Sequence, residues 1–97
     1  AEAEAEIESL TEKVRANPND FAAVSRLCNL LSFVQKWMDL FALVSARLDE
    51  SSNEEERAQL AKVRSKALRG MADVARREGR EDEAAMYDEM LREEASM

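Results

Sequence analysis

The sequence predicts an all-α fold, with five antiparallel helices forming a single domain over residues 1–97. The first reason is composition: the chain has only two Gly and one Pro, while the helix-favouring residues Ala, Glu, Leu, Arg and Met are abundant. The second is that apolar residues recur at three- and four-residue steps along most of the chain, which places them on one face of a helix. The third is that short polar clusters with capping residues separate these periodic segments. A chain of 97 residues fits one small core.

Residues 1–16 are predicted to form the first helix. The segment opens with alternating Ala and Glu, and the carboxylates there lie near the favourable positive end of the helix dipole. Its apolar content is sparse, but Ile7, Leu10 and Val14 form an i, i+3, i+7 stripe. Such a stripe is enough to dock one face of the helix on a neighbour.

Residues 17–49 are predicted to form the first helical hairpin, around which the rest of the chain is organised. An amphipathic pattern occurs twice within it, and the weak point between the two copies is at Gln35 and Lys36. We therefore expect the chain to turn there. The apolar positions of the two copies are Val24, Leu27, Cys28, Leu31 and Val34, followed by Trp37, Leu40, Phe41, Val44 and Leu48.

The start of this hairpin carries its own signals. Asn17 is a good N-cap residue, and Pro18 suits the first position of a helix. Asp20 stands three residues after Asn17, where the partner residue of a capping box belongs. These signals predict that the helix begins at Pro18.

A competing interpretation removes the turn at Gln35. Phe33, Trp37 and Leu40 fall at i, i+4, i+7, so a helix that continued through Gln35 would present all three on one face. That arrangement resembles the Phe-Trp-Leu helix with which a tumour-suppressor activation segment fills the groove of its ubiquitin ligase. Three apolar residues at helical spacing more often belong to a core.

Residues 53–95 are predicted to form a second hairpin whose first helix is extended, over about 54–78. Asn53 ends a polar cluster and can cap this helix, and three Glu residues follow in its first turn, as the dipole prefers. Gly79 is placed to end it. Gly70, inside the helix, costs about 1 kcal/mol relative to Ala and therefore indicates a close helix contact or a bend. The last helix returns over Glu81 to Glu94.

Two sets of residues in these hairpins resemble the tetratricopeptide repeat, a family of stacked antiparallel helix pairs. In the first hairpin, Val24, Leu27, Cys28 and Leu31 match the large, large, small, large set of that family's first helix. The second set is Leu68, Met71, Ala72, Ala75, Gly79, Ala84 and Tyr87. Gln35 departs from the family's turn glycine, and the two sets are offset by about ten residues beyond the usual period of about 34. The resemblance implies an irregular right-handed stack of helical hairpins.

The resemblance also implies a function: such repeats bind an extended or helical segment of a partner protein along the outward side of each first helix. In the first hairpin these positions are Ala22, Ser25, Asn29, Ser32 and Phe33, and in the second they are Lys66, Arg69, Asp73, Arg76 and Arg77. The second set is basic and would favour an acidic peptide or a chain-terminal carboxylate, because Arg forms bidentate bonds with carboxylates. In the alternative interpretation these are solvated charges that pair with acids on their own helix. The predicted partner-binding residues are Asn29, Phe33, Lys66, Arg69, Arg76 and Arg77.

An alternative contact surface is the apolar surplus of the central hairpin, namely Leu30, Phe33, Met38 and Phe41. Large exposed apolar groups in a small domain often mark a contact surface. These residues would then support self-association, as in a structural or oligomerisation bundle or an engineered helical scaffold. They could instead cover the flanking helices, which must dock on this hairpin.

Several classes of function have little support. The chain has no His and one Cys, and it has no Gly-rich phosphate loop, so we expect no enzyme, no cofactor and no metal site. Cys28 is expected to be a small buried hydrophobe. The net charge of −7 argues against binding nucleic acid, and no run approaches the ~20 apolar residues that span a bilayer. Because the N-terminal segment is acidic rather than basic, we expect an intracellular protein.

Overall fold

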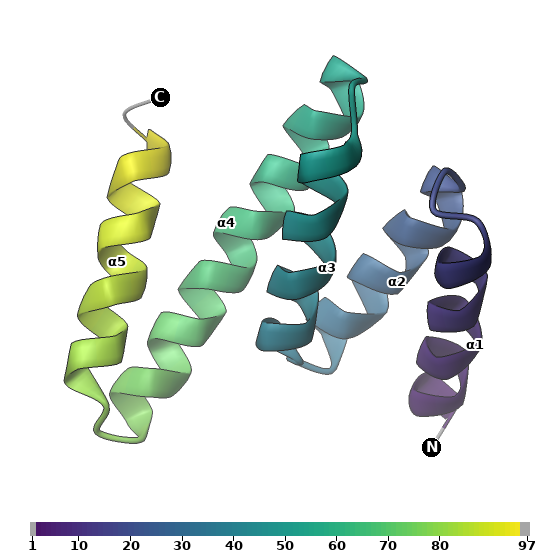
Figure 1. Cartoon of the computed structure of the whole chain (residues 1–97). Coiled ribbons are helices and arrows are strands. Elements are labelled where there is room, and N and C mark those ends of the chain that lie inside the picture. The colour runs from purple at the N-terminus through teal and green to yellow at the C-terminus, as the bar shows by residue number, and fades with distance from the viewer. Residues whose placement is uncertain (1, 96–97) are drawn as a thin grey trace.

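The computed structural model describes residues 2–95, and these residues form five α-helices without strands (Figure 1). This confirms the predicted all-α class. The long helix predicted over about 54–78 is α4. The bounds of the five helices are α1 (Glu2–Ala16), α2 (Phe21–Phe33), α3 (Trp37–Glu50), α4 (Glu54–Arg77) and α5 (Glu81–Ala95).

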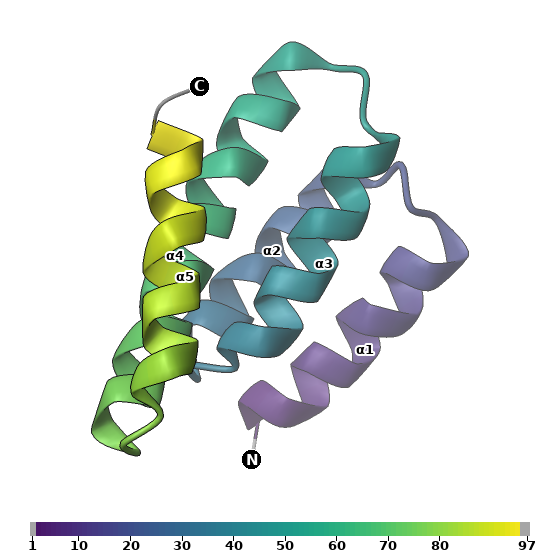
Figure 2. The same ribbon diagram turned by 60° about the vertical axis from the view of Figure 1, so that its left-hand side comes forward.

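The helices alternate between two layers. Each helix contacts the next one in the chain, and α2 also contacts α4. By contrast, no α-carbon of α1 lies within 8 Å of α3, and none of α3 lies within 8 Å of α5. The molecule is a plate of 37 × 35 × 15 Å, and 15 Å is the thickness expected of two layers of helices whose axes lie about 8–10 Å apart. Figure 2 shows α3 in front of α2 and α5 in front of α4.

The start of α2 differs from the sequence prediction. The helix begins at Phe21, and Asp20 is its N-cap, with the carboxylate accepting a hydrogen bond from the backbone N–H of Ala23 at 3.2 Å. Asn17 is engaged elsewhere, because its N–H donates to the carbonyl of Lys13 and its side chain accepts from the N–H of Asn19. The prediction that Asn17 caps this helix and that Pro18 is its first residue is therefore wrong.

Both hairpins reverse direction through the same turn. The chain passes through Gln35 with φ of 61° and through Gly79 with φ of 77°. In each case the next N–H reaches back five residues, from Lys36 to Leu31 at 2.9 Å and from Arg80 to Ala75 at 2.7 Å. These bonds, with those donated by Gln35 and Gly79 themselves, define the Schellman helix ending. A continuous helix through Gln35 is thereby excluded.

The core follows the same register in both hairpins. At the offset that relates Gln35 to Gly79, Val24 corresponds to Leu68, and each of them is fully buried. Four further pairs at this offset are also buried in both hairpins: Leu27 with Met71, Cys28 with Ala72, Leu31 with Ala75, and Leu40 with Ala84. Since α4 has 24 residues and α2 has 13, the extra length of the second hairpin lies at the start of α4.

No helix within residues 2–95 combines the length and the apolar character needed to cross a membrane.

Candidate functional site

Charge is unevenly divided between the two layers. The helices α2 and α4 contain eight Lys or Arg residues and four Asp or Glu residues, a formal charge of +4. The helices α1, α3 and α5 contain four basic and fifteen acidic residues, a formal charge of −11. The four charged residues between helices cancel one another, which leaves the net charge of −7. The plate therefore has one basic layer and one strongly acidic layer.

The predicted partner-binding residues all lie exposed on the basic layer. Asn29 and Phe33 are exposed on α2, and 81% of the surface of Phe33 is accessible. Lys66, Arg69, Arg76 and Arg77 are exposed on α4. Because α2 and α4 contact each other, the two sets lie on neighbouring helices of the same layer. We call these six residues the α2/α4 face.

The cations of the α2/α4 face are not equally available. Arg76 forms ion pairs with Asp73 at 3.2 Å and with Asp88 of α5. Its hydrogen bond to Asp88 raises the pKa of the guanidinium above the ordinary value for arginine. Arg77 donates to the backbone carbonyl of Asp73 at 3.5 Å. Among the described residues, Lys66 and Arg69 have no ion-pair partner. The charge of Arg76 is thus balanced by acids of α4 and α5, whereas Lys66 and Arg69 can form ion pairs with a ligand.

The four residues of the alternative apolar surface do not form one patch. Leu30 and Phe41 are partly buried against the core, and the guanidinium of Arg64 lies 5.0 Å from the centroid of the Phe41 ring. Phe33 and Met38 remain, with 81% and 69% of their surfaces exposed. The burial of Leu30 and Phe41 has a physical cause, since both fill space against the neighbouring helices.

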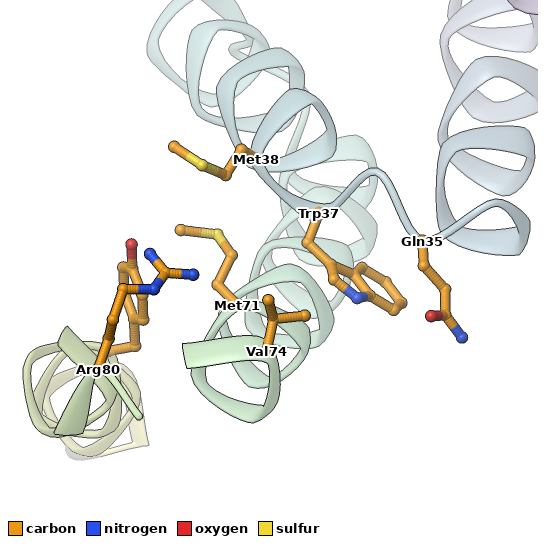
Figure 3. A pocket seen from close by; sticks show the side chains of 7 residues that line it. Gln35, Trp37, Met38, Met71, Val74 and Arg80 are labelled. Atoms are coloured by element: carbon orange, nitrogen blue, oxygen red, sulfur yellow. The ribbon is translucent and has the colours of Figure 1, made fainter. Parts of the chain in front are cut away.

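A hollow of about 130 Å³ opens between the starts of α3 and α5 (Figure 3). Met71 and Val74 of α4 lie at its base, Trp37 and Met38 come from α3, and Tyr87 comes from α5. Gln35 and Arg80, from the two turns, complete the lining. Sequence reasoning did not bring these side chains together, because they come from three helices and two turns; the only sequence signal is that several of them are Met or aromatic.

Two further features concern chemistry rather than binding. Cys28 is buried, and burial raises the pKa of its thiol to about 11, which keeps the group protonated and unreactive near neutral pH. Within residues 2–95, no three His, Cys, Asp or Glu side chains are close enough together to hold a metal ion.

Comparison of the chain with protein-family models, with curated proteins and with solved structures found no match.

Proposed function

We propose that this protein is a non-catalytic interaction module that binds an acidic segment of another protein on the α2/α4 face. The observation that carries the proposal is the separation of charge between the two layers. In a chain whose net charge is −7, the layer of α2 and α4 carries +4, and two of its exposed cations, Lys66 and Arg69, have no ion-pair partner among residues 2–95. An acidic ligand is attracted to this face and repelled by the other.

The chemistry of the face suits a peptide with a mixed character. Lys66 and Arg69 can each donate charge-assisted hydrogen bonds to carboxylates. Phe33, at the end of α2, offers an exposed ring that an apolar side chain of the partner can cover. The helices α2 and α4 run in the same direction and end in matching turns (Figure 1), so Phe33 and Arg77 are each the last residue of their helix.

We also propose a tetratricopeptide-like arrangement of the hairpins. It is supported by the alternation of consecutive helices between two layers, by the contact of α2 with α4, and by the matching buried positions of the two hairpins. The extended α4 departs from the family's regular period. In this arrangement the α2/α4 face is the side on which such repeats bind their partners.

The test is a charge reversal with a control of equal net charge. The probe is a synthetic acidic peptide of about 15 residues that contains Glu, Asp and one Phe, and its binding is measured by calorimetry. Lys66→Glu with Arg69→Glu is expected to weaken binding by at least about tenfold. Lys13→Glu with Arg15→Glu, at exposed sites of α1, changes the net charge by the same amount and is expected to have a small effect. If both double variants weaken binding equally, the ligand responds only to net charge and the proposed site is wrong.

The alternative function, self-association through exposed apolar residues, is favoured by the exposure of Phe33 and Met38. Sedimentation equilibrium over a wide concentration range separates the two proposals. A monomer is expected. A dimer that dissociates on Phe33→Glu would instead support a structural or oligomerisation role.

A further inference from the structure

The helix α4 carries a row of three cations, Lys62, Lys66 and Arg69, in its middle part. They stand at i, i+4 and i+7, the spacing that places side chains on one side of a helix. All three are exposed. We call these three residues the α4 cation row.

The other cations of α4 are bound within the protein. Arg57 donates to backbone carbonyls at the end of α3, and Arg64 forms an ion pair with Glu94 of α5. Arg76 and Arg77 are both bonded to Asp73. By contrast, no member of the α4 cation row has an ion-pair partner among residues 2–95. The cations of α4 that can pair with a ligand are therefore neighbours in one row.

The sequence of α4 explains why the row is unpaired. No Asp or Glu stands three or four residues from Lys62 or Lys66, the spacing at which ion pairs form on a helix. Asp73 is four residues from Arg69, but it pairs with Arg76. Each member of the row instead has another cation one turn away, and like charges at this spacing repel each other. In a chain with a net charge of −7, such a row is a local conflict of the kind expected at a functional site.

Acidic residues limit the α4 cation row at both ends. Glu55 stands two helical turns before Lys62, and Asp73 stands one turn after Arg69; both acids are exposed. A long polyanion lying along α4 would meet these like charges, whereas a short acidic block would not. From Lys62 to Arg69 the row measures about 10 Å, at 1.5 Å per residue. The row therefore suits a ligand with about three acidic groups over that length.

We propose that the acidic segment of the partner is a helix that lies along α4, with three Asp or Glu residues facing the α4 cation row at three- or four-residue steps. This inference rests on the proposed function, because it specifies the segment that the basic layer binds. Two helices side by side have the same rise per residue, so acids with this spacing stay level with the three cations. On an extended segment, residues of one side lie about 6.6–6.8 Å apart. Its third carboxylate would lie about 13 Å from the first, which exceeds the length of the row.

The first test compares labelled peptides of about 18 residues, each with three Glu in a helix-forming background of Ala and Gln. The matched peptide has Glu at i, i+4 and i+7. The spread peptide has the same composition, but its Glu residues at i, i+5 and i+10 point to different sides of the helix. The broken peptide is the matched peptide with a central Pro, which interrupts the helix. Fluorescence anisotropy at low ionic strength measures binding, because salt screens exposed charges. The matched peptide is expected to bind about fivefold more tightly than either of the others.

The second test uses Lys62, which belongs to the α4 cation row but not to the α2/α4 face. Lys62→Gln is expected to weaken binding of the matched peptide by about threefold, because one of three ion pairs is lost. Lys62→Arg keeps the charge and is expected to retain the affinity. The control is Lys13→Gln, at an exposed site of α1, which changes the net charge by the same amount and is expected to have no effect. Circular dichroism confirms that each variant remains folded.

Several results would overturn this inference. Equal binding of the matched and spread peptides would show that the spacing of the acids is not read, and equal binding of the broken peptide would show that the ligand is extended. Tighter binding of a peptide made of Glu alone would show a response to total charge. In each of these cases the proposed function still stands if acidic-peptide binding is lost in Lys66→Glu with Arg69→Glu. If that double variant has no effect on any acidic peptide, the proposed function itself is wrong.

Discussion

The indole of Trp37 lies directly on the backbone of Gly70. A Cβ atom placed on Gly70 would come within 2.3 Å of Cδ2 and 2.4 Å of Cε2 of the ring, far closer than two carbon atoms can approach. The first residue of α3 therefore packs directly against the backbone of α4 at Gly70. At the corresponding position of α2, Arg26 forms an ion pair with Glu6 of α1 at 2.8 Å, so the two helix interfaces use different chemistry at the same place.

Gly70→Ala is expected to lower the free energy of unfolding by about 1–3 kcal/mol, because the added methyl group displaces the indole of Trp37. Helix propensity alone predicts the opposite sign, a gain of about 1 kcal/mol. Urea denaturation of the variant decides between them. In a Trp37→Ala background the steric conflict is absent, so Gly70→Ala is expected to be stabilising there. A loss of equal size in both backgrounds would show that the cost does not come from the indole.

Gln35→Gly is expected to stabilise the protein by about 0.5–1 kcal/mol, because Gln35 has a positive φ of 61° that favours glycine. The reciprocal change, Gly79→Ala, is expected to destabilise it by about 1 kcal/mol. Apart from Gly79 itself and its two chain neighbours, no residue has an atom within 4 Å of the Cβ position at Gly79, so this cost is conformational rather than steric. Thermal denaturation measures both variants, and a stabilising Gly79→Ala would contradict the account of the two turns.

Leu40→Ala is expected to lower the free energy of unfolding by about 2–5 kcal/mol, since Leu40 is fully buried and its removal leaves a cavity between the layers. The control is Phe33→Ala on α2. Because 81% of the surface of Phe33 is exposed, that variant is expected to change the free energy of unfolding by less than about 0.5 kcal/mol. Similar losses in the two variants, measured by chemical denaturation, would mean that Phe33 is covered in solution, for example by self-association.

The buried thiol of Cys28 predicts a pH dependence of stability. Its pKa is about 11 in the folded protein against 9.0 without the fold, so above pH 9 the unfolded chain releases a proton that the folded chain retains. The stabilising contribution is therefore complete below pH 9 and is lost as pH rises toward 11. Comparison with Cys28→Ala isolates this effect, because the corresponding residue of the second hairpin is already Ala72. The wild-type protein is expected to lose more stability than the variant between pH 8 and pH 10.5; parallel profiles would refute the prediction.

The sequence by itself determined the helices. Apolar spacing, the cap at Asn53 and the glycine at Gly79 are local signals, and they act through backbone hydrogen bonds and helix periodicity within a few residues. The local signals failed where two of them competed, at Asn17 and Asp20, because Asn17 was already engaged in ending α1. The basic stripe of α4, from Lys66 to Arg77, could also be identified, since residues on one helix face keep a fixed spacing.

Only the tertiary structure decided which surfaces those helices share. The sequence could not separate Phe33 and Met38, which are exposed, from Leu30 and Phe41, which pack on the core, because all four are apolar residues of one hairpin. Nor could it place Met38, Met71 and Tyr87 around one hollow. Which side chains are buried, and which lie side by side, depends on contacts between residues far apart in the chain. Those contacts form only when the two layers pack and Trp37 lies against Gly70.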